Sequence, residues 1–288
     1  MSLMKSLRAA FTRTRLDDGQ KTQCANDLYQ IFCRLRANEC TELDDSHPPH
    51  SSNLYLCPLR YIDQNPLDMD DKDTLWMLDG YRSQWTTIHR KGAGRSEFIC
   101  SMLDHHFSSF MRVDRDGKEV DALASEFGWF PCNCDEKVLL DNFEAFEHPE
   151  SKNRLQPWIA EIRTVMDRTD GTPHILIFLV HASASDEKLL RVEILTMLGI
   201  MISRMKAKPF AEHIIIPVMV VSSFADCKAR ILQGFMTDTG PVIYNTGLYD
   251  FNDQENRDDH LQKCLGYMTS TPIGNTQQLN YRPARPVD

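Results

Sequence analysis

The chain has 288 residues, of which 42% are hydrophobic and 25% charged, and its formal net charge is −9. This composition is typical of a globular protein with a sizeable core, built as one large domain or two small ones. The negative charge disfavours general binding of DNA or RNA, which needs a positive field. No apolar run reaches the roughly eighteen residues of a membrane-spanning helix, so we expect no membrane partner.

The nine cysteines are odd in number and irregularly spaced, and no signal peptide precedes them. This pattern favours a reducing, intracellular compartment, either the cytoplasm or the nucleus. Residues 1–16 contain four basic residues and no acidic one. Two interpretations of this segment stay open: a basic first helix that packs on an acidic body, or a mitochondrial presequence.

Apolar spacing predicts the first elements. A helix is expected over 17–40, followed by a polar loop over 41–53. A second helix is expected from the glycine-rich segment at 92–94 through Phe110, followed by a tight turn at 114–117. A strand at 118–127 and an amphipathic helix over 155–166 come next.

The segment 174–221 gives the clearest prediction. His174–Val180 and Ile214–Val221 are apolar runs with the length and β-branched content of strands buried on both faces. The residues between them, from Leu189 to Met205, have largely helical apolar spacing. Together they predict a strand–helix–strand unit, with parallel strands if both belong to one sheet.

After that unit, strands around 229–235 and 242–249 predict a C-terminal hairpin. The expected fold is therefore α/β or α+β, with a mixed central sheet flanked by helices. We predict three blocks: a helical and loop-rich N-terminal extension over 1–90, the core domain over 91–268, and a loosely packed tail over 269–288.

Two places in the predicted core domain have residues that could bind a ligand or take part in catalysis. Gly92 and Gly94 precede a helix and have Arg95 beside them, an arrangement that can bind phosphate at a helix N-terminus or serve as an ordinary glycine turn. His181 ends the first buried strand, where ligands gather in open α/β sheets. It is a candidate catalytic residue of a pocket at this edge, or a hydrogen-bonded structural histidine.

A third arrangement joins distant segments. Glu97 opens a helix, Asp121 follows a predicted hairpin, and a buried strand, a helix and a further strand come later. This order resembles the PD-(D/E)xK nuclease-like fold. The resemblance implies that Glu97 and Asp121 hold Mg²⁺ and that a later strand supplies Glu-x-Lys. Here residues 179–183 carry neither a carboxylate nor a lysine, and Glu-Ile-Arg at 161–163 lies in the predicted amphipathic helix.

A second resemblance rests on three segments, residues 214–224, 229–233 and 247–251. These are similar to the C-terminal half of uncharacterised proteins of filamentous ascomycete fungi. The resemblance implies a compact intracellular domain and supplies no catalytic residue.

The function that we expect is that of an intracellular binding or scaffold protein on a degenerate nuclease-like core, with a protein as its partner. The alternative is an enzyme: a Mg²⁺-dependent nuclease that uses Glu97 and Asp121, or a small-molecule enzyme with its pocket near His181. No metal-ligand set is complete, and no cofactor is predicted except Mg²⁺ for the nuclease.

Overall fold

The computed structural model describes residues 19–35, 42–43, 55–58, 93–109, 112–113, 119–132, 157–165, 172–270 and 275–279. The basic segment 1–16, Gly92 and the turn at 114–117 lie outside these ranges, as does most of the loop 41–53.

A mixed β-sheet forms the centre of the protein. Its strands, from edge to edge, are β2 (Tyr55–Pro58), β11 (Gly240–Asn245), β10 (Lys228–Thr237), β9 (Val218–Ser223), β7 (Ile175–Val180), β6 (Trp158–Val165) and β5 (Trp129–Pro131). Strand β12 (Tyr249–Asp250) pairs with one end of β10. Two short pairs lie outside this sheet, β1 (Glu42–Leu43) with β8 (Leu189–Leu190) and β3 (Arg112–Val113) with β4 (Glu119–Val120).

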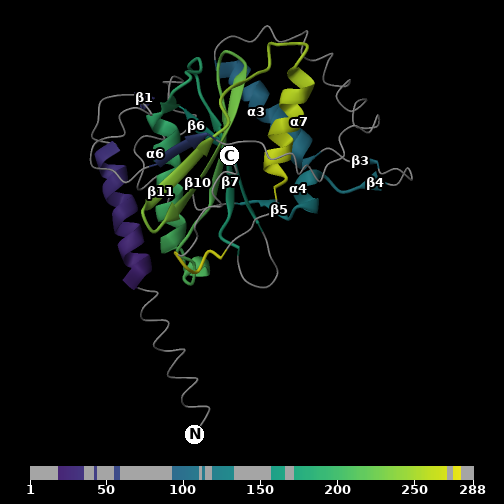
Figure 1. Ribbon diagram of the computed structural model, residues 1–288. Helices are drawn as coiled ribbons and strands as arrows, with labels where there is room; N and C mark the ends of the chain where they lie inside the picture. The colour runs from purple at the N-terminus through teal and green to yellow at the C-terminus, as the bar shows by residue number, and fades with distance from the viewer. Residues whose placement is uncertain are drawn as a thin grey trace, which may run out of the picture.

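Helices cover both faces of the sheet (Figure 1). The helix of residues 19–35 and α6 (Arg191–Lys206) pack on one face, in one apolar cluster with the sheet. On the other face, α3 (Ala93–Ser108), the short α4 (Leu123–Glu126) and α7 (Arg257–Met268) share a second cluster with it. Within the described ranges, no helix is long and apolar enough to cross a membrane.

The strand–helix–strand prediction is confirmed. β7 and β9 are parallel neighbours, and α6 lies between them in the chain. Every residue of both strands is buried, which explains why the two runs lack polar alternation. β9 begins only at Val218, because Pro217 has no N–H and the amides of Ile214 and Ile215 donate to the carbonyl of Thr276 instead.

The other strand pairs of the sheet include parallel and antiparallel ones. β10 is antiparallel to β9 and to β11, so the predicted C-terminal hairpin is confirmed as β10–β11. β5, β6 and β7 are antiparallel in turn, whereas β2 is parallel to β11. The sheet is therefore mixed and flanked by helices, as the sequence predicted.

The helix predicted over 155–166 is wrong, because Trp158–Val165 within this range form strand β6. The register with β7 shifts between Ile159 and Glu161, which marks a β-bulge. The bulge puts Ile159 and Ile162 on the same face, where both pack against the α6 cluster. Two apolar residues three positions apart are typical of a helix, and here the extra residue of the bulge produces that spacing.

The strand predicted over 118–127 is also largely wrong. Among its described residues only Glu119–Val120 form a strand, and α4 begins at Leu123. Leu123 and Ala124 of this short helix are buried in the cluster that α3 forms with the sheet. Two apolar neighbours can be buried together on a helical turn, whereas a strand would point them to opposite faces.

Candidate functional site

His181 follows the last residue of β7 and is 2% exposed. Its ring stacks on Phe224 with a centroid separation of 4.6 Å and an angle of 13°. Its backbone N–H donates to the carbonyl of Ser223 at 2.9 Å, and its carbonyl accepts the hydroxyl of Ser96 at 2.7 Å. The backbone of His181 thus joins β9 to the first turn of α3.

A buried ion pair lies near the His181 ring, on the α6 face of the sheet. Arg230 of β10 and Glu193 of α6 are both fully buried. Nε of Arg230 donates to one carboxylate oxygen of Glu193 at 2.9 Å, and Nη2 donates to the other at 2.5 Å. The Arg230 guanidinium also lies 5.2 Å from the centre of the Phe224 ring. Such bidentate geometry compensates the cost of removing both charges from water.

The same ion pair anchors the segment between β7 and α6. Arg230 donates to the carbonyls of Asp186 at 2.9 Å and Lys188 at 3.1 Å. Glu193 accepts the backbone N–H of Leu190 at 2.8 Å, which satisfies a free amide at the start of α6. The buried charges therefore fix the path of the chain as it leaves the sheet edge.

Two polar atoms at this edge have no hydrogen-bond partner in the part of the chain that the structure describes: Nε2 of His181 and the hydroxyl of Ser222. Burial lowers the pKa of His181 to about 4; Glu193 opposes this shift and Arg230 adds to it. His181 is therefore neutral at physiological pH, and one ring nitrogen can accept a proton or a hydrogen bond.

The three predicted catalytic residues occupy different surroundings. Glu97 is exposed in the first turns of α3, and Asp121 is exposed just after β4. β4 belongs to the separate two-stranded sheet, so Asp121 is not carried by the central sheet. The ring of His181, in contrast, is buried against Phe224. Across the described ranges, no three His, Cys, Asp or Glu side chains form a group that could hold a metal ion.

Two of the three predicted phosphate-binding residues lie in the first turn of α3. The helix begins at Ala93, so Gly94 and Arg95 are helical, and Gly92 lies outside the described residues. Arg95 is close enough to Cys227 to favour the thiolate of that residue, although burial raises the pKa of Cys227 overall. Phosphate binding by Gly92, Gly94 and Arg95 stays a prediction.

A second charged cluster, which the sequence did not predict, joins β6 to α3. Arg163 is 5% exposed and donates from Nε at 3.0 Å and from Nη2 at 2.7 Å to one carboxylate oxygen of Asp104. Glu161 lies on the same side of β6, with a carboxylate oxygen 3.9 Å from Nη2 of Arg163. Burial raises the pKa of Glu161, Arg163 opposes this, and Asp104 adds to it.

Three carboxylates influence the buried thiol of Cys100 in α3. Burial raises the pKa of Cys100, and Asp104, Glu161 and Glu97 each raise it further. Glu97 and Glu161 thus act on the same thiol, one from α3 and the other from the central sheet. The sequence signal for Glu161 was the alternation of Glu161, Ile162 and Arg163 on a strand, which the helical assignment of 155–166 hid.

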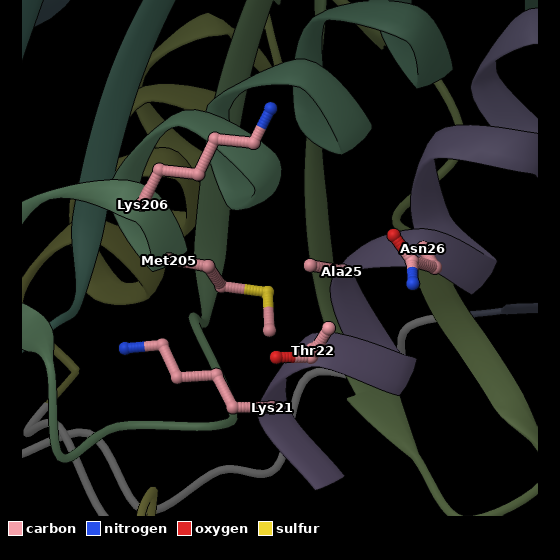
Figure 2. A pocket seen from close by; sticks show the side chains of 6 residues that line it. All are labelled: Lys21, Thr22, Ala25, Asn26, Met205 and Lys206. Atoms are coloured by element: carbon pink, nitrogen blue, oxygen red, sulfur yellow. The ribbon is translucent and has the colours of Figure 1, made fainter. Parts of the chain in front are cut away.

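An open groove of about 490 Å³ lies between the helix of residues 19–35 and the end of α6 (Figure 2). Its lining residues are Lys21, Thr22, Ala25, Asn26, Met205 and Lys206.

In comparisons with known proteins, no family model, no curated protein and no solved structure matches this chain.

Proposed function

We propose that this protein is a binding or scaffold protein on a degenerate nuclease-like core, and that it acts through a protein partner rather than by cleaving bonds. The order of elements supports the nuclease-like core. A helix (α3), an antiparallel strand pair (β5 and β6), a buried strand (β7), a helix (α6) and a further strand (β9) follow one another in the chain. β7, α6 and β9 form the strand–helix–strand unit described above.

One observation carries the proposal: β7 has no polar side chain. A nuclease of this kind needs Glu-x-Lys on the strand that β7 represents. Residues 175–180 are Ile-Leu-Ile-Phe-Leu-Val, and all are buried. On the α3 face, where the carboxylates of α3 and β6 lie, this strand contributes Leu176, Phe178 and Val180 to the apolar core. A strand packed in this way supports the sheet and offers no ligand to a metal ion.

The neighbouring strand β6 points to the same conclusion. Its acidic residue, Glu161, lies beside the guanidinium of Arg163, which is held by Asp104. An arginine cannot serve as a proton acceptor, and its positive charge occupies the position next to the carboxylates that a metal ion would need. The charges of β6 and α3 thus stabilise one another within the fold.

Two measurements on the full chain test this function. The purified protein should not cleave single- or double-stranded DNA or RNA with Mg²⁺ or Mn²⁺ above the level of a mock preparation. Affinity capture from its native cells should return the same protein partner in independent replicates. Cleavage that co-purifies with the chain would contradict the proposal, as would the persistent absence of any reproducible partner.

The second candidate function is a Mg²⁺-dependent nuclease. The observation in its favour is that the carboxylates of Asp104 and Glu161 both lie beside Arg163, and that Glu97 acts on the same Cys100 thiol as they do. Carboxylates are the ligands that Mg²⁺ prefers, and the ion would activate a water molecule and stabilise the phosphate in hydrolysis. If the chain cleaves nucleic acid, Glu161→Gln should abolish the activity, and Glu255→Gln, an exposed control with the same change of charge, should not.

A further inference from the structure

The groove between the helix of residues 19–35 and α6 has an apolar floor and basic walls. Met205 is 4% exposed and forms the floor together with Ala25, which packs against the same core. Figure 2 shows the Met205 side chain extending toward Thr22 and Ala25 of the other helix. A methionine floor adapts to apolar groups of different shapes, because its side chain is flexible and polarizable.

Among the described residues that line the groove, the two charged ones are lysines. The Lys21 ammonium donates to the carbonyls of Phe210 at 2.5 Å and Ala211 at 2.8 Å, which fixes its position at the edge of the groove. Lys206 is exposed, and its ammonium lies 5.9 Å from the centre of the Tyr29 ring. Tyr29 is itself 51% exposed, so an aromatic surface continues from the groove.

The described lining of the groove differs in charge from the chain as a whole. The formal net charge is −9, yet none of the lining residues that the structure describes is acidic. The nearby carboxylate of Asp27, on the same helix, accepts a hydrogen bond from Gln23. The acidic surface of the protein repels an acidic ligand, whereas the lysines of the groove attract it. This contrast directs the ligand to the groove and favours one orientation of it there.

We propose that this groove binds an acidic segment of a protein partner, with an apolar side chain against Met205 and a carboxylate at Lys206. The proposal deepens, and rests on, the binding function given above. A volume of about 490 Å³ accommodates a few side chains of an extended segment, within the range of about 300–1,000 Å³ that ligand sites span. The exposed ring of Tyr29 extends the apolar contact beyond the groove.

The test measures fluorescence anisotropy of a labelled short peptide in which pairs of glutamates alternate with leucines. The full-length protein should bind it, and should bind the matching glutamine–leucine peptide much more weakly. Lys206→Gln should weaken binding by about two- to fivefold, the contribution of one exposed ion pair. Thr22→Glu, which places a negative charge at the exposed lip, should weaken it at least as much, whereas Thr22→Gln should not.

Lys263→Gln is the matched control, since it removes the same charge from α7, on the opposite face of the sheet, and should leave peptide affinity unchanged. Thermal unfolding of each variant checks that it is folded. An equal loss of peptide affinity in Lys206→Gln and Lys263→Gln would overturn the inference, because the electrostatic attraction would then not be specific to the groove. So would tighter binding of a single-stranded oligonucleotide or of decanoate than of the acidic peptide. If no peptide binds but a native partner is captured equally by wild type and Lys206→Gln, this groove is excluded and the binding function stands.

Discussion

The Arg230–Glu193 ion pair allows a quantitative test of how the sheet edge is held together. Both side chains are fully buried, and Arg230 makes two hydrogen bonds to Glu193 and two to backbone carbonyls. Arg230→Met removes the positive charge and leaves the Glu193 carboxylate buried. The loss of one partner of a buried pair costs about 3–5 kcal/mol of unfolding free energy. With a urea m-value of about 3 kcal/mol per M, the midpoint should fall by roughly 1 M or more.

The double variant Arg230→Met/Glu193→Leu separates pairing from packing. Neither charge is then buried, and the remaining losses are the hydrogen bonds to the carbonyls of Asp186 and Lys188 and to the amide of Leu190. The carbonyl of Lys188 belongs to an exposed residue, so water can replace part of this loss. The double variant should therefore be more stable than Arg230→Met by about 2 kcal/mol. The reasoning is refuted if Arg230→Met costs less than about 1 kcal/mol. It is also refuted if the stability lost in Arg230→Met and in the single variant Glu193→Leu adds up in the double variant.

Three further outcomes are expected. The buried His181 has a pKa of about 4, below that of an unfolded histidine, so the unfolded state binds the proton first as pH falls. The free energy of unfolding should therefore fall by roughly 3 kcal/mol between about pH 6.5 and 4. In urea unfolding at a series of pH values, His181→Gln should remove this part of the pH dependence. Gly234→Ala should cost about 1–3 kcal/mol in thermal or urea unfolding, because the new Cβ would lie 2.6 Å from Cε of Met197, and adding Met197→Leu should recover much of the loss. A thiol reagent should label the exposed Cys33 within the native protein, whereas Cys264, whose pKa burial raises, should be labelled only on unfolding; mass spectrometry of the labelled peptides distinguishes the two.

The strand–helix–strand unit could be predicted from the sequence because its signal is local. β7 and β9 are buried on both faces, so they are continuous apolar runs, and the helix between them is long and mostly apolar. The edge strand β2 could not be predicted in the same way. It pairs with β11, whose residues lie nearly two hundred positions later in the chain, and no pattern within Tyr55–Pro58 specifies that partner.

Strand β6 shows how one irregularity hides both a fold element and a candidate site. In a regular strand Ile159 and Glu161 would lie on the same face, so the sequence lacks the apolar–polar alternation that identifies a strand. With the bulge, the apolar spacing mimics a helix, and Glu161 and Arg163 look like its solvated side. The structure instead buries Arg163 and pairs it with Asp104, which is partly exposed.

The buried pair at the opposite face was hidden for a different reason. Glu193 and Arg230 are 37 residues apart in the chain, and a single charge in a helix or strand normally indicates a solvent-exposed position. Their burial becomes understandable only once the sheet brings β10 beside β9, so that Arg230 reaches both Glu193 and the carbonyls that follow β7. These buried charges hold the first turn of α6 and the segment before it. The last turn of the same helix carries Met205 and Lys206 of the basic groove, so the ion pair and the groove both depend on where this one helix is placed.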